Sequence, residues 1–245
     1  MYRKMGFYEK YIKRILDIIC SSLAILCFSW LYAIIAVLVR VNLGKPVLFK
    51  QPRPGLIDPR TGKERIFDML KFRTMTDEKD KKGNPLPDEV RLTSFGRKLR
   101  ATSLDELPEA FNILKGDMSI IGPRPQLIRD MVFMTDTQRM RHTAKPGLSG
   151  LAQVMGRNAI SWDEKLKWDL KYIQHISFLG DLRIVWLTAK KVFWKQESSE
   201  ELDVTLDYGD ALLKAGKISE KEYRENQAVA KVLMKEFEKE KLRIV

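Results

Sequence analysis

The first strong pattern in the chain is a stretch of apolar positions near its start. Residues 18–39 contain no charged side chain, and about twenty apolar residues are enough to cross a bilayer as a helix. Positive residues favour the cytoplasmic face of a membrane, and they stand on both flanks: Arg3, Lys4, Lys10, Lys13 and Arg14 before the stretch, and Arg40, Lys45, Lys50 and Arg53 after it. We therefore prefer a re-entrant helix with a bend near Ser29 and Trp30 to the alternative, a single span.

Downstream, the polar and apolar positions follow shorter periods. Proline and glycine are frequent in 45–62, which predicts a link made of turns, and the polar run 76–88 predicts a surface loop. The apolar positions of 66–72 fit a strand or a helix, because the run is too short for its period to decide. Apolar positions that recur every three or four residues predict helices at 95–100 with Ser94 as its cap, after the acidic pair 105–106, from 162, from 178 to 195, and after Ser219.

Two of these helices carry a further signal at their starts. Ser161 and Glu164, and again Ser219 and Glu222, have the spacing of a capping box, in which each side chain bonds the other residue's main-chain N–H. The helix of 178–195 has an aromatic and basic edge that suits either lipid headgroups or core packing. The tail helix is expected to dock on the domain or on a partner.

These patterns predict a mostly α fold with minor β, an α/β protein, in three parts. The parts are a membrane-associated N-terminal helix at 1–44, a main domain with interfacial amphipathic helices at 45–195, and a charged, helical tail at 196–245. The net charge is +12, and the tail by itself carries −3, so the basic excess belongs to the other two parts. Such an excess suits an anionic partner: nucleic acid, an anionic membrane face or a phosphorylated substrate.

The cysteines and histidines exclude two kinds of site. Cys20 and Cys27 lie seven residues apart in the apolar stretch, so on a helix they share a face without reaching each other. A disulfide framework is therefore excluded, and chemistry facing the cytosol is the simplest interpretation. His142 and His175 lack the Cys/His spacing of a zinc site and are interpreted as ordinary polar residues.

Two short motifs carry the candidate chemistry. Asp105 and Glu106 are adjacent carboxylates at or beside a predicted helix start, where the helix dipole favours negative charge and should keep them ionised. The alternative role for Glu106 is a capping box with Ser103, although Pro108 suits a helix that starts nearer Asp105. Arg124 stands between two prolines, which push its backbone toward extended geometry and stiffen the turn.

Together these motifs suit phosphoryl transfer, in which cations position and neutralise an anionic target. The chain offers cations near these elements at Lys71, Arg73, Arg97, Arg100, Arg124 and Arg157, and oxygen ligands at Asp105, Glu106, Asp117 and Asp181. Hard oxygen ligands beside phosphate indicate Mg²⁺. A carboxylate can also attack directly and form an acyl-phosphate, which requires no histidine base.

From Lys13 to about Phe193 the chain resembles the bacterial sugar transferase family, the monotopic phosphoglycosyl transferases, and within it the small single-domain members. The motifs that carry the resemblance occur in one order over most of the chain. They are Lys13-Arg14-Ile15-Leu16-Asp17, Gln51-x-Arg53-Pro54-Gly55, Lys71-Phe72-Arg73-Thr74-Met75, Ser103-Leu104-Asp105-Glu106-Leu107-Pro108, Asn112-x-Leu114-Lys115-Gly116-Asp117-Met118-Ser119, Ile121-Gly122-Pro123-Arg124-Pro125, and Pro146-Gly147-x-x-Gly150-Leu151-Ala152-Gln153-Val154-x-Gly156-Arg157-Asn158.

The resemblance implies an enzyme that moves a sugar-1-phosphate from a UDP-sugar to a polyprenol (undecaprenyl) phosphate and releases UMP, the first membrane step of glycoconjugate assembly. It implies that Asp105 attacks the β-phosphate in a ping-pong scheme with a covalent aspartyl-phosphosugar intermediate. It also implies that Glu106, with Asp105 beside it, holds Mg²⁺. The other implied site residues are the phosphate- and substrate-binding Lys71, Arg100, Arg124 and Arg157 and the supporting Asp181.

The family's membrane segment is a re-entrant helix, in agreement with the two basic flanks. This places the enzyme at the inner (cytoplasmic) membrane, with the catalytic domain on the cytoplasmic face and the lipid bilayer as a partner. Relatives often break this helix at a Ser-Pro pair, whereas this chain has Ser29-Trp30 and no proline in the segment.

Several alternatives stay open from the sequence. The identity of the UDP-sugar is undecided, because small pocket changes control such choices. A second copy of the chain and downstream glycosyl transferases are both open as partners. The rival function is a non-catalytic, membrane-anchored scaffold for glycosyl transferases. A nucleic-acid partner is not expected, because the apolar stretch has no role in such a protein.

Overall fold

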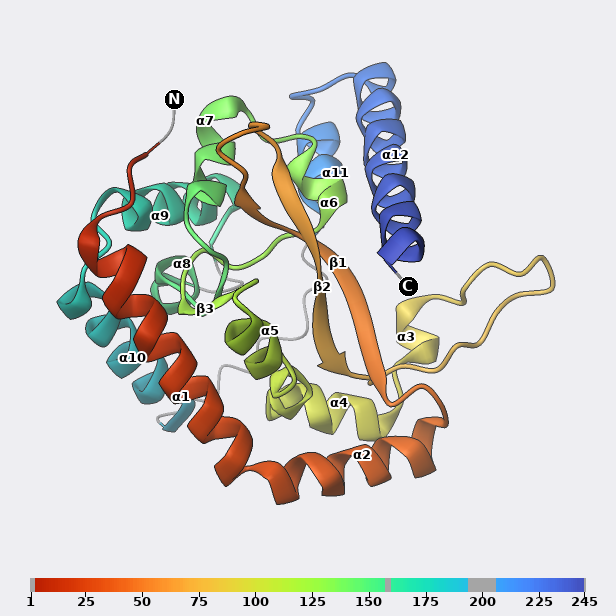
Figure 1. Cartoon of the computed structure of the whole chain (residues 1–245). Coiled ribbons are helices and arrows are strands. Elements are labelled where there is room, and N and C mark those ends of the chain that lie inside the picture. The colour runs from red at the N-terminus through yellow and green to blue at the C-terminus, as the bar shows by residue number, and fades with distance from the viewer. Residues whose placement is uncertain (1–2, 157–159, 194–205, 245) are drawn as a thin grey trace. The chain divides into compact units, whose positions relative to one another are not determined.

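The computed structural model describes residues 3–156, 160–193 and 206–244. They are mostly helical, with two small two-stranded sheets (Figure 1), which confirms the prediction of a mostly α fold with minor β. The chain forms two compact units. We call Leu16–Gln51 with Asp68–Gly116 the dyad unit, and Met1–Ile15 with Pro52–Phe67 and Asp117–Val245 the turn unit. The division into 1–44, 45–195 and 196–245 stays a prediction.

The apolar N-terminal stretch is a bent pair of helices. A π-helical turn, η1 (Tyr8–Ile12), continues into α1 (Lys13–Cys27), and α2 (Ser29–Leu43) follows after a break at Phe28. The bend is 64° (Figure 1), one residue before the predicted position at Ser29. Within the described parts of the chain, no single helix has the length and apolar composition to cross a membrane, whereas this pair taken together meets that criterion.

A long hairpin follows, of β1 (Leu48–Ile57) and β2 (Glu64–Phe72). The prediction of a turn-made link at 45–62 was therefore wrong for most of its length. Proline lacks the N–H that a sheet ladder uses, but in a two-stranded sheet each strand has a free edge to which that position can point. The run 66–72, which fitted either a strand or a helix, is a strand.

The core of the dyad unit lies between α2, the end of β2 and α4 (Ser94–Ala101), with α3 (Asp88–Arg91) before it. Ile35 and Val39 of α2 are buried against Phe72 and Leu99. Helix α4 begins as predicted within one residue, but its cap is Thr93, whose hydroxyl accepts a hydrogen bond of 3.1 Å from the N–H of Gly96. The 3₁₀ turn η2 (Leu104–Glu106) and helix α5 (Glu109–Lys115) complete the unit.

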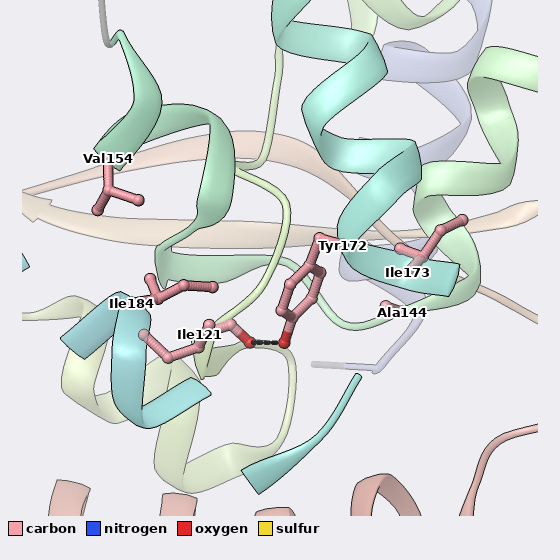
Figure 2. Close-up of a cluster of buried hydrophobic side chains, with 6 residues drawn as sticks. All are labelled: Ile121, Ala144, Val154, Tyr172, Ile173 and Ile184. Atoms are coloured by element: carbon pink, nitrogen blue, oxygen red, sulfur yellow. Dashed lines mark hydrogen bonds between the residues drawn. The ribbon is translucent and has the colours of Figure 1, made fainter. Parts of the chain in front are cut away.

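The turn unit is built around a short parallel pair of strands, β3 (Ser119–Ile121) and β4 (Gly147–Ser149), in the register Ser119 to Gly147 and Ile121 to Ser149. Figure 2 shows the core cluster beside these strands, in which the Tyr172 hydroxyl donates a 3.2 Å hydrogen bond to the Ile121 carbonyl. The other elements are α6 (Ile128–Met131), α7 (Asp136–Arg139), η3 (Met140–Thr143), α8 (Leu151–Met155), α9 (Trp162–Gln174), α10 (Phe178–Phe193), α11 (Tyr208–Lys214) and α12 (Glu220–Ile244).

Helices α9 and α10 agree with their sequence patterns. The Ser161 and Glu164 capping box is present, with Ser161 N–H donating to the Glu164 carboxylate over 2.9 Å. On α10, Ile184 is buried in the core, whereas Leu182 and Trp186 are exposed. The core-packing interpretation therefore describes the inner face of this helix, whereas contact of the exposed apolar outer face with lipid headgroups stays a prediction.

The tail is helical, as predicted, and α11 and α12 pack against the rest of the turn unit. The main-chain N–H of Tyr208 donates to the buried Asp130 carboxylate over 2.9 Å. Tyr223 stacks on Phe133 with ring centroids 5.6 Å apart, and Ala230 is buried against α6. The tail therefore shares its core with residues 127–134, which begin two positions after the Pro-Arg-Pro motif.

Candidate functional site

The Asp-Glu dyad lies in a single 3₁₀ turn of the dyad unit. The residue before this turn, Ser103, has a left-handed backbone (φ 55°), and its side chain makes no cap bond. The capping-box role for Glu106 was therefore wrong, because a capping serine needs extended geometry to reach the N–H three residues on. Helix α5 begins only after Pro108, at Glu109, where the proline leaves the helix ladder intact.

Lys71 lies against two carboxylates, one at the end of this turn and one at the start of α5. Its ammonium is 2.7 Å from Glu106 Oε1 and 3.3 Å from Glu109 Oε1. Glu109 is only 2% exposed. Asn112 fixes this arrangement, because its side chain accepts from Leu70 N–H over 2.9 Å and donates to the Asp68 carbonyl over 2.8 Å, which joins β2 to α5.

Sequence reasoning missed both Glu109 and Asn112. An acid at a helix start is usually solvated and favoured by the helix dipole, so this position alone gives no signal that Glu109 is buried. Asn112 lies within one of the family motifs. It follows Glu109 by three residues, so the two side chains share one face of a helix, and this spacing was the signal that could have identified them. Only the packing of β2 on α5 reveals that Asn112 holds the strand that carries Lys71 and that Glu109 pairs with the Lys71 ammonium.

Asp105 is buried, with 7% of its surface exposed. Burial raises the pKa of its carboxyl, the neighbouring Glu106 acts in the same direction, and the charges of Lys71 and Arg100 lower it. The expectation that a helix dipole keeps Asp105 ionised was therefore incomplete. Lys71 and Arg100 oppose the effect of burial without cancelling it, so the pKa of Asp105 stays above its ordinary value.

Arg100 is oriented by the close approach of α4 to the end of β2. Its Nε donates to Thr74 Oγ1 over 3.0 Å. Gly96 makes this approach feasible, since a Cβ there would lie 1.9 Å from the Thr74 carbonyl oxygen. The other two candidate cations of this unit make structural contacts: Arg73 pairs with Asp77 at 2.7 Å, and Arg97 donates to the Leu92 carbonyl over 2.8 Å.

Arg124 belongs to the turn unit, where the main-chain carbonyls of Pro123, Arg124 and Pro125 each accept a hydrogen bond. Gly147 N–H donates to the Pro123 carbonyl over 3.0 Å, and the Arg53 guanidinium donates to the Pro125 carbonyl over 3.0 Å. The Arg141 guanidinium donates to the carbonyl of Arg124 itself over 2.6 Å. Glycine at 122 and 147 allows the two segments to touch, since a Cβ on Gly147 would lie 2.1 Å from the Gly122 nitrogen.

Asp181 lies in the turn unit as the acceptor of a buried polar cluster. Its Oδ2 receives bonds from the Lys13 ammonium at 2.5 Å and the Tyr8 hydroxyl at 2.9 Å, and its Oδ1 lies 2.9 Å from the Tyr172 hydroxyl, whose single proton it shares with the Ile121 carbonyl. Asp181 thus ties the N-terminal helix to α9 and α10. Arg157, another predicted site residue, lies outside the described residues.

His142 belongs to a second buried polar group of the turn unit. Its Nε2 lies 3.1 Å from an Arg141 nitrogen, which can only donate, so Nε2 accepts and Nδ1 carries the proton toward Glu64 at 3.0 Å. Burial lowers the pKa of His142 to about 4, and the bonds from His142 and Arg139 hold the pKa of Glu64 down at about 2 despite its burial. His142 is therefore neutral near pH 7, and it acts as a polar core residue.

The dyad offers two hard oxygen ligands for a divalent cation. No group of three or more His, Cys, Asp or Glu side chains converges on a metal position within residues 3–156, 160–193 and 206–244. Mg²⁺ is usually held by one or two carboxylates together with substrate phosphates and water. The chemistry of Asp105 and Glu106 fits that cation, with the substrate supplying the remaining oxygens.

Comparison with known proteins adds an independent finding. The model of the family described as bacterial sugar transferase matches residues 8–195. The chain is 46% identical over 196 residues to an uncharacterized sugar transferase, EpsL, of Bacillus subtilis, a match that covers 80% of this chain and 94% of that protein.

Two further relatives have more specific names. The UDP-glucose:undecaprenyl-phosphate glucose-1-phosphate transferase of Klebsiella pneumoniae is 37% identical over 191 residues, which are 74% of this chain and 40% of that protein. The undecaprenyl-phosphate galactose phosphotransferase of Salmonella typhimurium is 35% identical over 204 residues, 75% of this chain and 41% of that protein. The chain thus spans about two fifths of the length of these two relatives.

Proposed function

The chain belongs to the bacterial sugar transferase family, and on that premise we propose that it transfers a sugar-1-phosphate from a UDP-sugar to a polyprenol phosphate and releases UMP. The observation that carries this proposal is the environment of Asp105. A buried carboxylate whose pKa is raised by burial is flanked by two cations that act against that rise. The relatives named for undecaprenyl-phosphate sugar transfer support the same reaction.

The first half-reaction is an attack of the Asp105 carboxylate on the β-phosphorus of the UDP-sugar. A bond forms between the carboxylate oxygen and phosphorus, the bond from phosphorus to the bridging oxygen breaks, and UMP leaves. Lys71 and Arg100 lie beside the dyad and neutralise charge as the two anions approach. Their second task is to keep Asp105 ionised, because a protonated acid is a poor nucleophile.

In the second half-reaction an oxygen of the polyprenol phosphate attacks the same phosphorus, and Asp105 leaves as a free carboxylate. We assign phosphate binding to Arg124 as well, because a guanidinium matches phosphate oxygens in pairs. Glu106 is the carboxylate we assign to Mg²⁺, with Asp105 beside it. When bound, Mg²⁺ would neutralise charge on the diphosphate and on departing UMP.

We also propose that the bent pair α1 and α2 is a re-entrant membrane helix and that the main domain lies on the cytoplasmic face of the inner membrane. The bend of 64° and the basic residues on both flanks support this arrangement. The exposed outer face of α10, with Leu179, Leu182 and Trp186, suits the boundary between headgroups and acyl chains.

The test uses the full chain in detergent or nanodiscs, with a panel of UDP-sugars and undecaprenyl phosphate. UMP release is measured for the wild type and for Asp105→Asn, which keeps the shape of the side chain and removes its charge. The variant should lose roughly a thousandfold or more of the rate. Asp136→Asn, on an exposed acid of α7, is the matched control and should keep the wild-type rate.

A donor labelled in the β-phosphate should also leave a phosphosugar on the peptide that contains residue 105, and EDTA should stop turnover. Wild-type UMP release by Asp105→Asn would remove Asp105 from the role of nucleophile. An absence of turnover with every UDP-sugar would favour the scaffold alternative.

A further inference from the structure

The Pro-Arg-Pro turn has an unusual hydrogen-bonding problem. Pro123 and Pro125 have no main-chain N–H, so of these three residues only Arg124 can donate from its backbone. A turn with so few donors is held in place chiefly through its carbonyl oxygens. Donors for those oxygens must come from elsewhere in the fold, and an arginine that is to grip phosphate needs a fixed backbone.

Within the described residues, each carbonyl of the turn accepts a hydrogen bond, and the donors differ in kind. The donor to Pro123 is the backbone of Gly147, and the donor to Pro125 is the side chain of Arg53 in the middle of β1. The donor to the central carbonyl, that of Arg124, is the guanidinium of Arg141 at 2.6 Å. Arg141 is 1% exposed and is among the most completely buried large side chains of the described residues.

Arg141 is itself held from two further sides. Its Nε and one terminal nitrogen both bond Asp169 Oδ2, at 2.9 and 2.7 Å, and Asp169 is 2% exposed. The other terminal nitrogen bonds Nε2 of neutral His142. Stability alone does not account for this buried ion pair, because the free-energy cost of desolvating two charges can exceed the energy of their attraction.

We propose that Arg141, oriented by Asp169, is a positioning residue for Arg124 and so controls the affinity of the site for the diphosphate of the donor. One guanidinium bonds the Arg124 carbonyl and the Asp169 carboxylate at the same time through its planar fork. Lysine keeps the charge but has a single nitrogen at the end of a flexible chain. Lysine at 141 can therefore neutralise Asp169 or bond the turn, and it cannot reproduce the fixed geometry of both bonds.

This inference rests on the proposed function, since it assigns phosphate binding to Arg124. Its test is a double-mutant cycle with four proteins: wild type, Arg141→Lys, Arg124→Ala and the double variant. KM for the UDP-sugar and kcat are measured for each by UMP release. Arg141→Lys should raise KM by roughly tenfold with a smaller change in kcat. The double variant should match Arg124→Ala alone, because the bond from residue 141 acts through residue 124.

The matched control is Arg139→Lys. Arg139 pairs with Glu64 at the far end of the same buried polar group, and in the part of the chain that the structure describes it does not bond the turn's carbonyls. It should lower the melting temperature without raising KM. If Arg141→Lys does not accumulate as folded protein, Asp169→Asn replaces it, because it removes the partner that orients the guanidinium and leaves the guanidinium in place.

The outcomes separate the two claims. If Arg141→Lys keeps the wild-type KM, or if its loss is added in full to that of Arg124→Ala, this inference is overturned and the proposed function stands. If Arg124→Ala keeps the wild-type KM, Arg124 is not a phosphate ligand and the positioning role is rejected with it. If the wild type turns over no UDP-sugar, the proposed function fails and the inference fails with it.

Discussion

The ion pair between Lys13 and Asp181 allows a quantitative test of what holds the N-terminal residues in the core of the turn unit. The two charged groups lie 2.5 Å apart, and their side chains are 10% and 8% exposed. Asp181→Asn would leave the Lys13 ammonium buried without its counter-charge. Breaking a buried pair from one side costs about 3–5 kcal/mol. For a protein of this size each kcal/mol corresponds to about 2–4 °C in melting temperature, so a decrease of roughly 6–20 °C is expected.

The second half of this test removes both charges. Lys13→Met leaves an aspartate that still accepts bonds from the hydroxyls of Tyr8 and Tyr172, each at 2.9 Å, so its cost should be smaller than that of Asp181→Asn. The double variant Lys13→Met with Asp181→Asn should be more stable than Asp181→Asn alone, because no uncompensated charge stays buried.

The assay is thermal unfolding in one detergent at one scan rate, and the control is the exposed pair of Lys217 and Asp163, which lie 2.9 Å apart. The corresponding cycle at that pair should show almost no coupling, since solvent screens exposed charges. A fall of less than about 2 °C for Asp181→Asn, or strictly additive effects in the buried cycle, would refute the reasoning.

Three further predictions follow from single contacts. Lys71→Met should raise the pKa of Asp105, which Lys71 lowers, and should therefore move the acid limb of the kcat/KM profile to higher pH by roughly one pH unit. If the acid limb does not move, the ionisation of Asp105 does not determine it. His142 has a pKa of about 4 in the fold against a usual 6.5, so unfolding takes up a proton between these two pH values and the free energy of unfolding falls as the pH drops through that window. In urea unfolding, His142→Gln should remove about 3 kcal/mol of this decline. A pH dependence identical to that of the wild type would contradict the assignment of His142 as neutral. Gly209→Ala would place a Cβ 2.3 Å from the ring of Phe133, which should destabilise the packing of α11 and α12 by about 1–3 kcal/mol and speed hydrogen exchange in α12. Unchanged exchange would show that the ring moves aside at no cost in free energy.

Much of the local structure could be predicted from the sequence because its causes are local. The cap of α9 at Ser161, the end of α5 at Gly116 (φ 101°) and the helical tail after Ser219 each depend on residues a few positions apart. The bend in the apolar stretch was placed within one residue of its position at Phe28. The family motifs likewise identified Asp105 and Arg124 as candidates, although their roles stay proposals.

The predictions of local structure that were wrong failed because contacts distant in the sequence decide the structure at those positions. Residues 48–57 contain two prolines and a glycine, and they form a strand only because β2 pairs with one edge and leaves the other open. Ser103 and Glu106 have the spacing of a capping box, but the backbone at Ser103 is left-handed, so the dyad lies in a 3₁₀ turn. A spacing rule carries no information about which backbone the surrounding core selects.

The sequence by itself determined the apolar bent helix, the order of the helices, the acidic dyad and the arginine between two prolines, because each is encoded in neighbouring residues. Only the tertiary structure decided which charges meet: Lys71 with Glu106 and Glu109, Lys13 with Asp181, and Arg141 with Asp169 and the Arg124 carbonyl. The partners in these contacts lie between 17 and 168 positions apart along the chain. Burial and partner choice depend on how the whole chain packs, and that is why the electrostatics of the site could not be predicted from its motifs.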